Sequence, residues 1–186
     1  MRLTVIAVLA SFLAACTAAT RIWIDPKEPV LKTPQERVQL VGHVMRGSIE
    51  DAKAPVQWTS SDPKIVSVDQ DGYVRGISSG RTTVVAHYGN LSARVPVEVS
   101  FVQGLSAKMG SITLSYSKGS PIDPGVVPMG YDGRVLKDRT LTWGTDDVKI
   151  CRPDGTGQVW PGEVGQTTVT ATVEGHSVKI PCTVVK

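Results

Sequence analysis

Short apolar runs separated by turn residues make up most of the chain. In residues 82–88 and 93–99 apolar and polar side chains tend to alternate, so one face of each segment packs on a core and the other meets solvent. Runs of this kind, rich in β-branched residues and bounded by glycine, predict antiparallel strands, and helix signals are nearly absent. In the first part of the chain the predicted strands are residues 37–44, 56–59, 65–69, 73–77, 82–88 and 91–99.

The chain repeats itself without gaps at an offset of 85 residues. Trp143 follows Trp58 at this offset, and residues 165–171 repeat the pattern of residues 80–86. The repeat predicts two domains, residues 21–100 and 105–186, and the short linker between them predicts a semi-rigid rod. Roughly seven short strands per unit, with one Trp on a mid-chain strand, predict an all-β fold of two immunoglobulin-like β-sandwiches.

A family resemblance supports this fold. Residues 58–63, 65–69, 71–77 and 80–86 together resemble the bacterial immunoglobulin-like domain, group 2. The second unit resembles it more distantly, because Pro153 and Pro161 replace Val68 and Gly76. The resemblance implies a spacer or interaction module of bacterial surface proteins, among them adhesins.

The N-terminus predicts export. Residues 1–15 begin with Arg2, continue with an apolar run and end in small residues, as a cleaved signal peptide does. Residues 13–16 resemble the lipobox of bacterial lipoproteins, which implies a lipid on Cys16, followed by a short tether over residues 16–20. Thr17 in place of Asp implies the outer membrane, in a periplasmic or surface-facing orientation. The alternative is an ordinary secretory signal with a chance Cys.

The two remaining cysteines predict a disulfide. In the repeat alignment Cys151 and Cys182 replace Val66 and Val97, and paired replacement indicates spatial neighbours in the fold. An oxidising compartment favours the bond. Closing a loop of about 32 residues stabilises the second unit by roughly 3 to 4 kcal/mol in the chain-entropy model.

Composition and motifs argue against several functions. A net charge of +3 gives no support for nucleic-acid binding, and no apolar run is long enough to span a membrane. No nucleophile–base set, phosphate loop or metal spacing is present, so we expect a protein that is not an enzyme and has no cofactor. Three turn carboxylates, Asp62, Asp69 and Asp71, leave calcium open as an alternative to solvated turns.

Aromatic side chains and sheet edges are the candidate contacts. Trp160 stands where the first unit has Arg75, and Trp23, Tyr116 and Tyr131 are the other candidates. Residues 21–24 and 176–185 are candidate edge strands that accept a partner strand. The leading hypothesis is a lipid-anchored envelope protein that acts as a protein-binding or scaffold subunit. A cell-surface adhesin or a glycan-binding module is the alternative.

Overall fold

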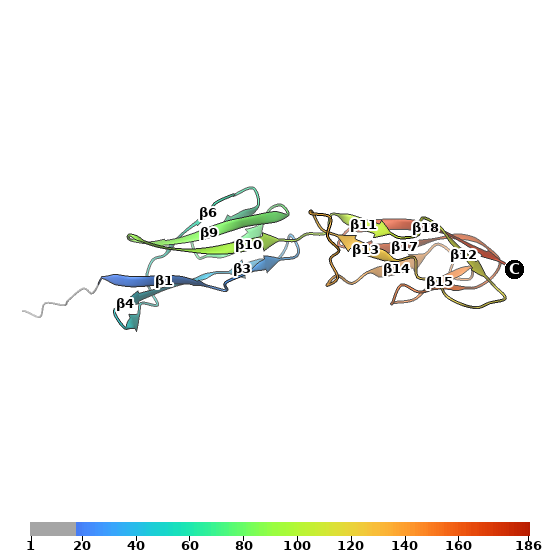
Figure 1. Cartoon of the computed structure of the whole chain (residues 1–186), viewed down its shortest axis with the longest axis horizontal. Coiled ribbons are helices and arrows are strands. Elements are labelled where there is room, and N and C mark those ends of the chain that lie inside the picture. Colours follow the sequence, from blue (N-terminus) through green and yellow to red (C-terminus); the bar gives the residue numbers. More distant parts are fainter. Residues whose placement is uncertain (1–17) are drawn as a thin grey trace, which may run out of the picture.

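The computed structural model describes residues 18–186. The predicted signal peptide and Cys16 lie outside the described residues. The described residues form strands and turns without a helix, so the predicted all-β class is confirmed. This part of the chain therefore contains no helix that could cross a membrane. Figure 1 shows two groups of strands arranged end to end, and in the described chain no strand of one group pairs with a strand of the other.

The first group forms the N-terminal half, and its strands build three sheets. The first sheet has the order β1 (Ala19–Asp25), β4 (Val41–Arg46) and β5 (Ile49–Glu50). The second has the order β3 (Arg37–Gln39), β8 (Tyr73–Gly76) and β7 (Val66–Val68). The third has the order β2 (Val30–Leu31), β10 (Leu91–Val99), β9 (Gly80–Tyr88) and β6 (Gln57–Ser60).

The second group forms the C-terminal half, again with three sheets. One is the pair β11 (Gly104–Ala107) and β13 (Val126–Met129), and another is the pair β15 (Cys151–Pro153) and β16 (Val159–Pro161). The largest has the order β12 (Ile112–Ser115), β18 (His176–Val185), β17 (Gly165–Val173) and β14 (Thr142–Thr145).

The two halves share strand registers at the offset of the sequence repeat. Trp58 of β6 lies opposite Ala86 of β9, and Trp143 of β14 lies opposite Ala171 of β17. In both halves a short strand also pairs in parallel with the last long strand, β2 with β10 and β12 with β18. The repeat seen in the sequence is therefore a repeat of strand pairing.

Each half has its own apolar core. The inward positions of β9 and β10 contribute to the first core and those of β17 and β18 to the second, as the alternation in residues 82–88 and 93–99 predicts for the first half. Val66 and Val97 are both completely buried in the first core. Cys151 and Cys182 occupy the matching places in the second core and are joined by a disulfide.

A turn glycine packs against the repeated Trp in each half. Gly72 has φ +80° and Gly157 has φ +94°, a conformation that side chains with a Cβ rarely adopt. A Cβ at Gly72 would lie 2.4 Å from the carbonyl oxygen of Leu40 and 3.1 Å from Cε2 of Trp58. A Cβ at Gly157 would lie 3.0 Å from Cζ2 of Trp143. The glycine is thus required by the turn and by the indole beneath it.

Three sequence expectations need correction. The strand predicted over residues 37–44 is interrupted at Leu40, which is buried and bonds Gly72 O, so β3 and β4 belong to different sheets. β1 starts at Ala19, within the predicted tether. β18 lies between β12 and β17, so residues 176–185 are not an edge strand, whereas β1 is at the edge of its sheet.

Candidate functional site

The four aromatic residues predicted as contacts come from four separate elements. Trp23 is in β1, Tyr116 follows β12, Tyr131 follows β13, and Trp160 is in β16. Among the described residues no hydrogen bond or ring contact joins any two of them. The structure therefore does not assemble them into one aromatic platform, and each has to be judged by its own surroundings.

Trp23 is covered by other protein groups. Its ring stacks on the imidazole of His43, with centroids 4.8 Å apart and planes 7° from parallel, and the Arg21 guanidinium lies 5.4 Å from the ring centroid. Its Nε1 donates to Asp25 Oδ2 at 3.1 Å. His43 in turn contacts Glu50 through Nδ1 at 2.5 Å. Trp23 thus belongs to a cross-strand cluster and offers little free ring surface.

Trp160 is the most exposed of the Trp side chains that the structure describes, and it is held in place. Its side chain is 40% exposed. Its Nε1 donates to Asp154 Oδ2 at 3.1 Å, and the other carboxylate oxygen accepts from the Thr156 hydroxyl at 2.7 Å. Backbone N–H groups of Thr156 and Gln158 donate to the same oxygen, Oδ1, at 2.9 Å and 3.1 Å. The carboxylate of Asp154 therefore fixes both the turn and the indole.

These hydrogen bonds stabilise the charged form of Asp154. The hydroxyl of Thr156 and then the indole of Trp160 contribute most, and they lower the pKa of Asp154 to about 2. In the described structure the side chain of the matching residue in the first half, Asp69, accepts from the backbone N–H groups of Asp71 and Tyr73 and from no side chain. Asp154 thus accepts two additional side-chain bonds, one from Thr156 in the turn and one from the Trp that replaces Arg75.

Arg152 lies beside Trp160 on the same surface. It is directly opposite Trp160 in the antiparallel pair β15–β16, so the two side chains point to the same face, and Arg152 is exposed and makes no ion pair in the described chain. Its neighbour Cys151 faces the core. We call Arg152, Asp154 and Trp160 the Trp160 surface.

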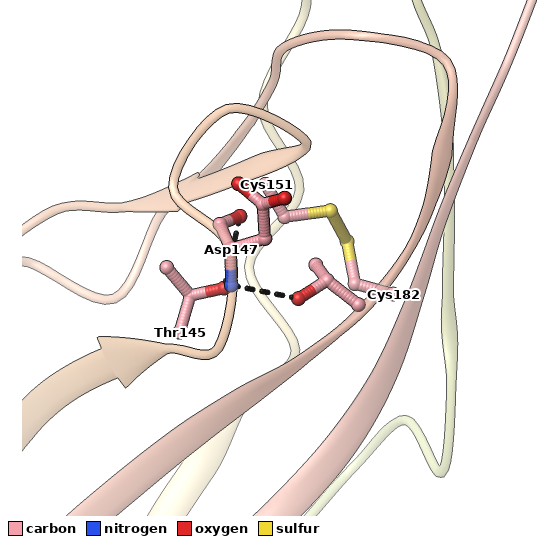
Figure 2. The surroundings of a disulfide bond; sticks show 5 residues. Thr145, Asp147, Cys151 and Cys182 are labelled. Carbon is pink, nitrogen blue, oxygen red and sulfur yellow. Dashed lines mark hydrogen bonds between the residues drawn. A yellow bond between two sulfur atoms is a disulfide. The ribbon is translucent and has the colours of Figure 1, made fainter.

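The disulfide ties this surface to the opposite sheet. Cys151 of β15 is bonded to Cys182 of β18, with the two Cα atoms 6.7 Å apart (Figure 2). The turn before β15 is fixed as well, because Cys151 N donates to Asp147 O and Asp147 N donates to the Thr167 hydroxyl at 3.0 Å. The strand that carries Arg152 is thus fixed by the disulfide to β18 and by the hydrogen bonds of Asp147 in the turn before it.

Tyr116 and Tyr131 are more loosely placed. Tyr116 is 62% exposed and is attached through its backbone N–H to Val185 O at 2.8 Å. Tyr131 is 40% exposed and lies in the turn after β13, three residues before Arg134, which bonds Glu98 of the other half. No hydrogen bond of either phenol oxygen is found in the described structure, so neither ring is oriented as Trp160 is.

The contact between the halves is a built interface that the sequence did not reveal. The side chain of Arg139 is only 6% exposed, and its Nη2 donates to Ser100 O at 2.7 Å. The guanidinium also lies 2.7 Å from an Asp138 carboxylate oxygen and 2.8 Å from one of Glu174. Near these residues in the chain, Val102 of the linker packs in a buried cluster with Leu136 and Val173.

Two ion pairs add to this interface. Lys32 Nζ lies 2.6 Å from Asp138 Oδ2, and this bond lowers the pKa of Asp138 below its usual range. Glu98 of the N-terminal half is bonded by Arg134 of the C-terminal half. Burial acts to raise the pKa of Glu98, but the hydrogen bonds from Arg134 and Arg81 outweigh it, so this pKa is lowered. We refer to these contacts as the junction.

The turn carboxylates bond their own backbone. Asp62 Oδ1 accepts from Lys64 N at 3.0 Å, and Asp69 Oδ1 accepts from the turn that follows it. Within residues 18–186 no group of three or more His, Cys, Asp or Glu residues is arranged to hold a metal.

Two shallow hollows of about 350 and 420 Å³ lie beside Pro96 and Pro181, on equivalent strands of the two halves.

Comparisons with known proteins place this chain among much longer relatives. It is 25% identical over 160 residues to ice-binding protein 1 of Shewanella frigidimarina, a match that covers 85% of this chain and 18% of that protein. It is also 25% identical to an uncharacterized protein of Clostridium acetobutylicum, over 69% of this chain and 13% of that protein. The chain thus spans less than a fifth of the length of the curated relatives it matches.

Two solved structures match this chain only distantly. Domains 4 and 5 of the S-layer protein SbsC match with a TM-score of 0.44 and 19% identity, covering 90% of this chain and 99% of that one. A C-terminal fragment of intimin, in complex with its translocated receptor, matches with a TM-score of 0.38 and 18% identity, over 89% of this chain and 64% of that one. Likenesses this distant say nothing about what this chain does.

The family match concerns the N-terminal half. It begins one residue before β1 and ends at the last residue of β10. The segments that carry the resemblance in the sequence, from Trp58 to Ala86, all fall within it. Residues 18–99 match the bacterial Ig-like domain (group 2).

Proposed function

We propose that this protein is a non-catalytic lipoprotein of the bacterial envelope whose two tandem immunoglobulin-like domains, residues 21–100 and 105–186, act as a protein-binding or scaffold subunit. A lipid on Cys16 holds it to the outer membrane. The bacterial Ig-like match of residues 18–99 favours a binding or adhesion-type role at the cell surface. It is also a kind of fold that is not enzymatic, in keeping with the absence of catalytic motifs in the sequence.

The Trp160 surface is the observation that carries the binding role. Trp and Arg are the residue types most enriched among the few side chains that dominate protein–protein affinity. Here the indole is fixed by Asp154 and the strand beneath it by the disulfide. Because both groups are already ordered, binding a partner costs little conformational entropy. An exposed Trp with that much support is best explained by a partner that covers it.

The junction supports the scaffold role. A flexible linker lets two domains turn independently, whereas a buried Arg139 and an apolar cluster at Val102 oppose such motion. A subunit that positions partners needs a fixed distance between its own ends. The two halves held end to end meet this requirement (Figure 1).

The glycan-binding alternative has less support. Sugar rings stack on open aromatic faces, but the ring of Trp23 is occupied by His43 and Arg21. Trp160 and the two tyrosines lie on separate elements. The Shewanella relative is named for ice binding, and since this chain spans 18% of that protein, we do not assign ice binding to it.

The proposal is tested by capturing the partner in cells that produce the full chain. A photo-crosslinking amino acid is placed at Arg152, and matched cells carry it at Tyr116 as the control position. We expect one envelope protein cross-linked at Arg152 and not at Tyr116. Trp160→Ala should abolish the cross-link, and Cys16→Ser should release the protein from the membrane fraction.

Recovery of peptidoglycan or lipopolysaccharide alone from the Arg152 position contradicts the protein-binding role and favours the glycan alternative. Membrane retention of Cys16→Ser contradicts the lipid anchor. These two results are independent, so each part of the proposal stands or falls on its own measurement.

A further inference from the structure

The end of the N-terminal half where β1 begins is formed by β1, β4 and β5. Ala19 lies opposite Arg46, and Arg46 lies opposite Ile49. Neighbouring strands are about 4.8 Å apart, so the Cα atoms of Ala19 and Ile49 are separated by about 10 Å. The start of the described chain and the β4–β5 turn therefore form one end surface.

Arg46 closes this end and keeps it rigid. Its guanidinium bonds the hydroxyl of Tyr88 in β9, lies 5.6 Å from the centre of that ring, and contacts Asp51 at 2.9 Å. The hydrogen bond from Arg46 also lowers the pKa of Asp51, which keeps the carboxylate charged. Arg46, which lies opposite Ile49, thus links the β1–β4–β5 sheet to β9 of the second sheet.

Ile49 is presented to the outside. At 75% exposure it is the most exposed of the large hydrophobic side chains in residues 18–186. Arg21, two residues into β1 from Ala19, is also exposed and makes no ion pair in the described structure. The Arg21 guanidinium lies over the Trp23 ring on one face of this sheet, and Ile49 lies on the other face, so both groups are near the same end. Exposed apolar, basic and Trp side chains are the types found where proteins meet the lipid–water interface.

The length of the chain between Cys16 and this end decides what covers it. Only Thr17 and Ala18 separate Cys16 from Ala19, and three Cα–Cα steps span at most about 11 Å. An acyl chain on Cys16 enters the bilayer, so the headgroups lie within that distance of Ala19. We propose that the end surface formed by Ala19, Arg21 and Ile49 docks on the lipid headgroups, an inference that rests on the proposed lipid anchor.

Docking of this end fixes how the molecule stands. The C-terminal half lies at the opposite end of the first half (Figure 1), so it projects away from the bilayer with the Trp160 surface. One basic residue close to an anionic membrane contributes about a fivefold gain in association. Docking of this end therefore holds the protein in one orientation relative to the bilayer, which the lipid anchor alone does not do.

The test uses the full-length lipidated protein in vesicles of phosphatidylethanolamine and phosphatidylglycerol. Ser48→Cys in the β4–β5 turn is labelled with an environment-sensitive fluorophore, and Ser117→Cys, beyond β12 in the C-terminal half, is the matched control. Lipids with a nitroxide on the headgroup are then added as quenchers. We expect quenching at Ser48 at least several times stronger than at Ser117. Equal quenching overturns the proposal.

Substitutions separate docking from mere proximity. Arg21→Gln should weaken the quenching at Ser48 by shifting the docked equilibrium about fivefold, and Ile49→Asp should weaken it further. Arg94→Gln removes an exposed cation from β10 and should leave it unchanged. If Arg94→Gln and Arg21→Gln have equal effects, the end surface is not the docking site.

Mass spectrometry of the N-terminal peptide keeps the two proposals apart. An acylated Cys16 with no preferential quenching at Ser48 means that the anchor stands and the docking is wrong. An unmodified Cys16 means that the anchor is wrong, and the docking fails with it.

Discussion

The indole Nε1 of Trp160 donates a hydrogen bond to Oδ2 of Asp154, 3.1 Å away, while Oδ1 of the same carboxylate holds the turn between β15 and β16. One side chain thus sets the turn and the aromatic ring together. In the first half the same turn is set by Asp69, but no indole is attached to it. The Trp160 surface is an addition to a turn that both halves share.

Asp154→Asn tests the role of this tie. Asn retains the side-chain oxygen that caps the turn, but it replaces Oδ2 with an amide that cannot accept from the indole. We expect the turn to persist and the Trp160 indole to become mobile, with partner cross-linking from Arg152 reduced severalfold. The indole N–H resonance of Trp160 in an NMR spectrum reports the change. The first-half variant Asp69→Asn is the control and should leave that resonance in place.

The same tie predicts a pH dependence. The pKa of Asp154 is about 2 in the folded protein, below its ordinary value of 3.8. Its contribution to stability is therefore complete above about pH 4 and is lost as the pH falls towards 2. The Trp160 indole resonance should stay constant from pH 7 to 4 and shift between pH 3 and 2. A midpoint near pH 4 would mean that the carboxylate is not held as the structure shows.

Removing the disulfide should destabilise one half. Cys151→Val with Cys182→Val restores the pair that the first core uses, Val66 and Val97. The sequence separation of 31 residues corresponds to about 3 to 4 kcal/mol in the chain-entropy model. Denaturation followed by the fluorescence of single-Trp variants should show a loss in the C-terminal half and none in the N-terminal half. A loss shared equally by both would show that the halves unfold together.

Arg139→Ala should loosen the junction. It leaves Ser100 O without its donor and Glu174 without its ion pair, at a cost of about 1 to 3 kcal/mol. Small-angle X-ray scattering should show a broader distribution of distances as the two halves turn relative to each other. Arg94→Ala removes an exposed arginine of β10 that is outside the junction as defined above, and it should leave the scattering unchanged.

Gly72→Ala should be more damaging than Gly89→Ala, although both glycines have positive φ. A Cβ at Gly89 meets nothing within 4 Å, so only the backbone strain of about 1 to 2 kcal/mol remains. A Cβ at Gly72 meets the Leu40 carbonyl oxygen at 2.4 Å and must displace backbone. Thermal unfolding of the two variants should differ by several degrees, and equal melting temperatures would contradict this packing.

Several features of the fold follow from the sequence because they depend on local pattern. The alternation in residues 82–88 and 93–99 lies within β9 and β10, and the repeat offset appears as equal registers around Trp58 and Trp143. The Cys151–Cys182 bond followed from the replacement of two valines, since equivalent core positions in a repeat are equally close.

Tertiary structure decided what depends on residues far apart in the chain. The place of β18 inside its sheet depends on β12, a strand some sixty residues earlier that pairs with it in parallel, and nothing in the pattern of β18 shows this. The junction joins Lys32, Ser100 and Arg139, which no local rule relates. The ring of Trp23 is covered by His43 of the neighbouring strand. The neighbour of Trp160 across its strand pair is Arg152, and the Trp160 ring stays exposed. Local patterns specify strands and turns, but the choice of exposed and covered side chains is made only when strands pair and layers pack.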